Sequence, residues 1–138
     1  MGRRLFVIAA LWVGCTAAVP LALAAGALDG KTFSGVIGQT GQTATQPDDL
    51  IFQDGTFEST LCTTQGYGKA AYKTKPLAEG LEFTVEATSA NGGRKQWHGV
   101  ANGDQIEATV VSMENGETTQ WWFQGSLRAP EAPAPPAP

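Results

Sequence analysis

The sequence is poor in the side chains that most catalytic and metal sites require. Its 138 residues include two cysteines and one histidine. It contains no Ser-His-Asp arrangement, phosphate-binding loop or paired-cysteine metal motif. Cys62 is the only thiol once the N-terminal segment is set aside, and one thiol cannot form an internal disulfide. We therefore predict a non-enzymatic protein with no catalytic residues, metal or cofactor, although thiol chemistry at Cys62 stays open.

Positive charge is also scarce. Without Arg3 and Arg4, which lie in the N-terminal segment, seven basic residues stand against thirteen acidic ones and give a net charge of −6. Nucleic-acid binding depends on neutralising phosphates with lysine and arginine. We therefore expect no nucleic-acid partner.

The one long apolar run lies at the N-terminus. Arg3 and Arg4 precede it, it extends from Leu5 to Val13, and small residues follow. This order is typical of a secretory signal peptide, which we predict over residues 1–27. The mature protein would be exported, periplasmic or secreted, and would keep no membrane span. Two alternatives are an uncleaved membrane anchor and a lipoprotein attached at Cys15.

The opposite end lacks any large apolar residue. Residues 129–138 are half proline, and such a run is expected to form an extended, disordered Pro/Ala-rich tail. The hundred or so residues between these ends are enough for one core but not for two. We therefore predict a single β-barrel domain over residues 28–128.

Helical periodicity is absent between these ends, and turn motifs take its place. Four glycine-containing motifs supply the positive φ angles that tight hairpin loops require. They are Asp54-Gly55, Asn91-Gly92-Gly93, Asn102-Gly103 and Asn115-Gly116. Short connections between consecutive strands predict an antiparallel meander.

Eight segments with strand-like patterns lie between these turns and the other connections. They run from Lys31 to Gly38, Asp49 to Gln53, Thr56 to Cys62, Gly68 to Lys75, Leu81 to Ala90, Arg94 to Ala101, Gln105 to Met113 and Thr118 to Leu127. We predict an all-β fold: an eight-stranded antiparallel up-and-down β-barrel in which the first strand closes against the last. A two-sheet sandwich is the alternative.

The turns also predict which residues pair. A shared apolar face results if the loops have two residues at 54–55, 102–103 and 115–116, and three residues at 91–93. The predicted pairs are Phe52 with Phe57, Ala87 with Trp97, Trp97 with Ala108, Ala108 with Phe123 and Val110 with Trp121. The connection from Gln39 to Asp48 is longer and rich in glycine, glutamine and threonine, so we expect a binding loop, a lid or a plain flexible loop.

We predict that His98 and Cys62, the two most reactive side chains, have structural rather than catalytic roles. The registers place His98 on the outer face between Glu86 and Glu107, where it forms a solvated cross-strand row. Strand alternation directs Cys62 away from the face that carries Phe57 and predicts an exposed thiol.

The strand order, the long first loop and the segment from Trp97 to Ala108 resemble small bacterial barrels of the calycin type. This broad group includes lipocalin-like and avidin-like proteins, and the resemblance points to an uncharacterised secreted branch. It implies that Phe33 replaces the tryptophan that lipocalins carry on their first strand. It also implies that Arg128 lies over that aromatic ring.

A closed meander of this size either fills its interior or holds one small ligand. We predict a binding protein for an apolar or amphipathic small molecule, with Tyr72 and Ser59 as polar contacts. The predicted ligand-binding residues are Trp97, Trp121, Phe83, Tyr72, Phe123 and Phe33. The alternative is a protein-interaction module or enzyme inhibitor of the cell envelope that acts through the 39–48 loop and the surface near Trp122. The sequence leaves the oligomeric state open.

Overall fold

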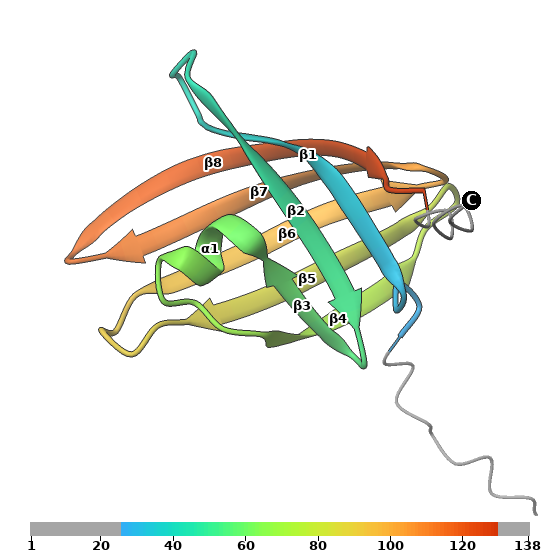
Figure 1. Ribbon diagram of the computed structural model, residues 1–138, viewed down its shortest axis with the longest axis horizontal. Helices are drawn as coiled ribbons and strands as arrows, with labels where there is room; N and C mark the ends of the chain where they lie inside the picture. Colours follow the sequence, from blue (N-terminus) through green and yellow to red (C-terminus); the bar gives the residue numbers. More distant parts are fainter. Residues whose placement is uncertain (1–25, 130–138) are drawn as a thin grey trace, which may run out of the picture.

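Eight antiparallel strands close into a barrel in the computed structural model, which describes residues 26–129 (Figure 1). The strands are β1 (Lys31–Gln39), β2 (Thr45–Gln53), β3 (Thr56–Ser59), β4 (Ala70–Pro76), β5 (Leu81–Thr88), β6 (Arg94–Asn102), β7 (Gln105–Glu114) and β8 (Glu117–Leu127). Each strand pairs with the next and β1 pairs with β8, which confirms the meander barrel and excludes the sandwich. Nearly all of the predicted signal peptide and tail lies outside the described residues.

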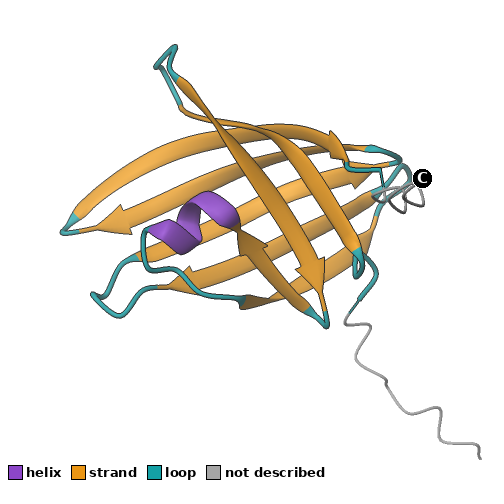
Figure 2. Cartoon of the chain, viewed as in Figure 1, coloured by secondary structure: helices purple, strands orange, loops and turns teal. Residues whose placement is uncertain are grey.

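A short helix, α1 (Thr60–Thr64), interrupts the meander after β3 (Figure 2). The third strand was expected to continue to Cys62, so the end of that prediction is wrong. The helix lies beside β2 and β3 at the end of the barrel that also carries the β1–β2, β5–β6 and β7–β8 turns (Figure 1). We call this the α1 end.

The interior is filled by aromatic rings from several strands. The Phe52 ring lies at the centre, with the rings of Phe33, Phe57, Tyr72 and Phe83 at centroid distances of 5.0 to 6.0 Å. These pairs meet edge to face, an arrangement that aromatic quadrupoles favour. Alternation along the strands therefore produces a packed aromatic core.

Two hairpins have the predicted register. Val110 lies opposite Trp121 and Ala108 opposite Phe123 between β7 and β8, and Phe52 lies opposite Phe57 between β2 and β3. Both turns have a positive φ at their first central residue, Asn115 and Asp54, and at the glycine that follows. This is the type I′ pattern that the motifs predict.

The β6–β7 register differs from the prediction. Trp97 pairs with Val110 rather than with Ala108. The central residues of the turn are Gly103 and Asp104, and Gly103 has a φ of 59°. A glycine with positive φ at the first central position is typical of a type II′ turn. Relative to the prediction, the pairing is shifted by one residue on each strand. The same side chains therefore still face the interior.

The β5–β6 register also differs. Val85 rather than Ala87 lies opposite Trp97, because the loop contains the five residues 89–93. The Ser89 N–H donates to the Gly93 carbonyl at 2.9 Å, and the Ser89 hydroxyl accepts from the Gly93 N–H at 3.0 Å. These bonds close a wider loop than the three residues expected.

The first connection is shorter than predicted. β2 begins at Thr45, and residues 45–48 pair with residues 35–38 of β1, so the loop contains only residues 40–44. Composition did not reveal that these polar residues continue the ladder. β3 pairs only from Leu50 onward, so Pro47 lies on an unpaired strand edge where it blocks no hydrogen bond. The β1–β2 hairpin projects beyond the barrel (Figure 1).

Closure of the barrel depends on a glycine at the seam between β1 and β8. Gly35 lies opposite Gly125, and a Cβ atom at Gly35 would lie 2.0 Å from the Gln124 carbonyl oxygen. No side chain fits at that distance. The missing Cβ therefore allows the two strands to approach and removes both edges of the sheet.

Candidate functional site

The α1 end holds a group of polar side chains inside an otherwise apolar interior. Asp48, Ser59, Cys62, Lys95 and Ser112 are each more than nine-tenths buried. Buried polar groups are costly unless they are paired, so such a group needs a structural or a functional reason.

Asp48 and Ser59 explain why the chain changes from strand to helix. Ser59 is the N-cap of α1, and its hydroxyl accepts from the Cys62 N–H at 3.2 Å. The Asp48 carboxylate accepts from the Ser59 hydroxyl at 2.6 Å, and from the Thr60 hydroxyl and the Leu61 N–H at 3.1 and 3.0 Å. These bonds satisfy donors at the helix start and fix α1 on β2. They also occupy the Ser59 hydroxyl that was expected to contact a ligand.

Lys95 is the most unusual member of the group because its side chain is only 8 % exposed. Its ammonium donates to the Gln65 side-chain oxygen and, at 3.5 Å, to the Cys62 sulfur. It also lies 4.5 Å from the centre of the Tyr67 ring, within the range of a cation–π contact. Two residues of the α1 region and one aromatic ring therefore surround a cation that points into the barrel.

Tyr67 connects this cation to the rim of the barrel. Its hydroxyl donates to the Glu114 carboxylate at the β7–β8 turn. Burial, followed by this hydrogen bond to a negative group, raises the pKa of Tyr67 to about 12. Tyr67 therefore contacts Lys95 through its ring and Glu114 through its hydroxyl.

Cys62 is buried, which corrects the prediction of an exposed thiol. Only 5 % of the residue is exposed. The strand alternation on which the prediction depended stops at Ser59, and the helical turn directs the side chain inward. Burial raises the pKa of the Cys62 thiol above its ordinary value, despite hydrogen bonds and the charge of Lys95 that act in the opposite direction. The thiol is therefore neutral at neutral pH.

A small cavity of about 30 Å³ lies beside Lys95. Its lining consists of Ile37, Gln46, Leu61, Cys62, Gln65, Lys95, Val110 and Trp121. A volume of this size holds a water molecule or two, whereas small-molecule pockets start near about 300 Å³. In this conformation the cavity combines apolar walls with one cation.

A second, larger hollow of about 280 Å³ also has Gln65 in its lining. Its lining is polar and comes from the rim of the barrel: Gln65, Ser89, Asn91, Gly93, Glu114 and Asn115. Gln65 is the residue that lines both spaces.

The six predicted ligand-binding residues fall into two groups. Five of them are buried in the barrel: Phe33, Tyr72, Phe83, Trp97 and Phe123. Trp121 alone is half-buried and borders the cavity at the α1 end. Their contact with a ligand stays a prediction, and Trp121 is the member placed beside an existing space.

Tyr72 uses its hydroxyl inside the protein. It donates to Asp29 at 2.7 Å and accepts from the Leu28 N–H at 3.1 Å, so it ties the segment before β1 to β4. Burial, followed by the hydrogen bond to Asp29, raises the pKa of Tyr72 to about 12. The polar group expected to contact a ligand therefore has structural partners.

The chain has two tyrosines, and their raised pKa values predict alkaline behaviour that can be measured. The neutral phenol is the form that the folded state favours. Its contribution to stability is therefore complete below pH 10, the ordinary pKa, and is lost as the pH rises towards about 12. Ultraviolet titration should show no tyrosinate near pH 10 in the folded protein and half-ionisation near pH 10 in denaturant. Ionisation of a tyrosine near pH 10 without unfolding would contradict this environment.

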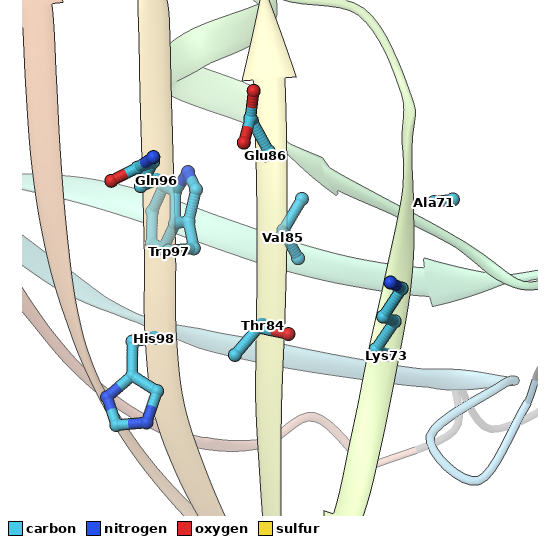
Figure 3. Close-up of a pocket in the computed structure, with 8 residues that line it drawn as sticks. All are labelled: Ala71, Lys73, Thr84, Val85, Glu86, Gln96, Trp97 and His98. Atoms are coloured by element: carbon cyan, nitrogen blue, oxygen red, sulfur yellow. The ribbon is translucent and has the colours of Figure 1, made fainter.

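A groove of about 480 Å³ also crosses the outer surface over β4, β5 and β6 (Figure 3). Exposed side chains of Lys73, Thr84, Glu86, Gln96 and His98 surround it. These groups are already solvated. Val85 and Trp97 also line the groove, but none of the five buried polar residues of the α1 end does so. The combination of an apolar wall and a buried cation therefore favours the α1 end as the candidate site.

His98 lies on the outer face as predicted, but its neighbours differ. The shifted registers place Thr84 and Thr109 opposite it instead of Glu86 and Glu107. Its Nε2 atom lies 3.5 Å from the Glu82 carboxylate, and the side chain is exposed. Such a surface contact contributes little to stability.

Arg128, which was expected to lie over the Phe33 ring, makes an ion pair with another residue, and its contact with that ring stays a prediction. The Arg128 guanidinium lies 3.6 Å from the Asp49 carboxylate. Phe33 itself is completely buried at the start of β1.

Lys95 and Gln65 were not identified from the sequence. Lys95 could have been found, because it alternates with Trp97, Gly99 and Ala101 and so shares their inward direction. A lysine at an inward position of a barrel strand is a conflict that predicts a special site. The sequence around Gln65 has no such pattern, because the direction of this side chain depends on the α1 turn and not on strand alternation.

None of residues 26–129 belongs to a helix long and apolar enough to cross a membrane. Among the same residues, no three His, Cys, Asp or Glu side chains are grouped so that they could hold a metal ion. Comparison with family models, curated proteins and solved structures gives no match for this chain. The function of the α1 end therefore has to be inferred from its own chemistry.

Proposed function

We propose that the chain is an exported, non-enzymatic barrel that binds a small amphipathic molecule at the α1 end. The observation that carries this proposal is the buried Lys95 ammonium beside an apolar-walled cavity. Ligand sites typically combine apolar walls with a few well-placed polar groups. Ile37, Leu61 and Trp121 supply the walls, and Lys95 supplies the polar contact.

The architecture supports the same proposal. Small closed meander barrels are the scaffold of calycins, so we assign the chain to a secreted, calycin-like group on the basis of its topology and the resemblance given above. The N-terminal sequence supports export. The separation of exposed His98 from buried Cys62 supports a role without catalysis, because a Cys/His nucleophile requires contact between the two side chains.

Tryptophan fluorescence tests this proposal. Three tryptophans lie in the described residues, and only Trp121 borders the cavity. Titration with 1-octanol, an uncharged amphipathic probe, should quench or shift the emission of the wild-type protein. Trp122→Phe should keep that response, because Trp122 lies on the outer face across Gly38, whereas Trp121→Phe should lose it. A response that persists in Trp121→Phe and is lost in Trp122→Phe would place binding outside the barrel and contradict the proposal.

A second candidate function is binding of another protein through the β1–β2 hairpin. One observation favours it: this hairpin projects from the barrel, with exposed residues 40–44 at its tip (Figure 1). The second surface named for this role is less favourable, because Trp122 is half-buried and packs across Gly38. Replacing residues 40–44 by a two-residue Asn-Gly turn should abolish partner capture under this alternative. Under the leading proposal it should leave octanol binding unchanged.

A further inference from the structure

Lys95 is a buried cation that lacks a carboxylate partner in direct contact. Within the described part of the chain, no carboxylate oxygen lies within 4.0 Å of its ammonium. Gln65 and Tyr67 offer dipoles and a ring but no net negative charge. Cys62 is a neutral thiol because of its burial. A buried charge is costly unless an opposite charge accompanies it, so this position is suited to an incoming anion.

A second buried donor lies close by on the same strand. The Trp97 indole N–H has no hydrogen-bond partner among residues 26–129. Trp97 and Lys95 are separated by one residue and both face the interior of the barrel. The indole nitrogen is turned towards the end of β5, which is the α1 end (Figure 3). This unpaired donor therefore points towards the end of the barrel that holds Lys95, although Trp97 lines neither space at that end.

Gln65 occupies the position that an incoming anion would take. Its side-chain oxygen accepts from the Lys95 ammonium, and the residue lines both the inner cavity and the hollow at the rim. A ligand oxygen with a full negative charge would make a stronger hydrogen bond to the ammonium than this neutral amide does. The two spaces that Gln65 lines have volumes of about 30 and 280 Å³, which together reach the lower end of the range for small-ligand pockets.

We infer that the ligand carries a carboxylate, which binds the Lys95 ammonium in place of the Gln65 side-chain oxygen, while its apolar part lies against Ile37, Leu61 and Trp121. This inference rests on the proposed function. A carboxylate matches the single cation present, whereas a phosphate dianion would require further positive groups. The nearby Glu114 and the acidic composition of the chain also disfavour a dianion.

Isothermal titration calorimetry with three probes of equal chain length tests the inference: octanoate, 1-octanol and octyl phosphate. The wild-type protein should bind octanoate at least about tenfold more tightly than octanol. Lys95→Met keeps the apolar stem but removes the charge, so it should reduce octanoate affinity at least about tenfold and reduce octanol affinity by a smaller factor. Lys75→Met, which removes an exposed lysine of β4, should behave like the wild type.

Each other outcome has a definite meaning. Equal affinity for octanoate and octanol in both proteins would overturn the carboxylate assignment and leave the proposed binding function standing. Tighter binding of octyl phosphate than of octanoate would overturn it in favour of a phosphate. Failure of all three probes to bind would overturn the binding function itself. If Lys95→Met does not fold, the comparison of the three probes on the wild-type protein still tests the carboxylate assignment.

Discussion

Replacing Phe52 by alanine is expected to lower the free energy of unfolding by about 4 kcal/mol, the largest effect of any single truncation considered. The ring is completely buried and contacts four other aromatic rings, which come from β1, β3, β4 and β5. Its removal leaves a cavity that the closed barrel cannot fill by moving one strand alone. For a domain of this size, such a loss is a large part of the total stability.

Equilibrium denaturation with urea measures this effect. Leu77→Ala is the matched control, because it also removes a large apolar side chain but one that is 38 % exposed in the turn after β4. The control should cost less than about 1 kcal/mol. If Phe52→Ala and Leu77→Ala had similar small effects, the interior would not be the packed aromatic core described above.

Replacing Asp48 by alanine is expected to cost about 3 kcal/mol and to release α1 from the barrel. The carboxylate is 2 % exposed and accepts three hydrogen bonds, from Ser59, Thr60 and Leu61. Hydrogen bonds to a charged, buried acceptor are among the strongest in proteins, and their loss leaves buried donors unpaired. The variant should therefore lose both global stability and the order of the strand-to-helix transition.

The release of α1 in Asp48→Ala can be measured separately from the loss of stability. Cys62 is protected by α1 in the wild-type protein, so its reaction with a thiol reagent should be at least about tenfold faster in Asp48→Ala. Asp104→Ala, which removes an exposed carboxylate from the β6–β7 turn, is the control and should react like the wild type. An unchanged rate in Asp48→Ala would show that this carboxylate does not hold α1 in place.

Alternation and turn motifs were sufficient to predict the barrel. The inward positions of β5 to β8 share one face, and this face stays the same when a hairpin slips by one residue on each strand. For that reason the meander and its closure were correct although the β5–β6 and β6–β7 registers were not. The precise pairing depends on turn closure, such as the bonds made by Ser89 and the positive φ of Gly103, and these are properties of the folded backbone.

The candidate site was harder to predict for a related reason. The prediction placed a ligand among inward aromatic rings, but four of those six rings pack against Phe52 or Phe57 in the core. The site at the α1 end depends on the helical turn that brings Cys62 and Gln65 against Lys95. That turn depends on Ser59 as the N-cap and on Asp48, which lies eleven positions before Ser59 in the sequence. A contact between such distant positions leaves no local pattern in the sequence.

The most direct test of the central claim, that a small amphipathic molecule binds at the α1 end, is a nuclear magnetic resonance titration of the labelled protein with octanoate. We expect the amide and side-chain signals of Leu61, Gln65, Lys95 and Trp121 to shift together and to saturate. Shifts confined to the outer groove around Thr84 and His98, or no shift at all, would contradict the claim.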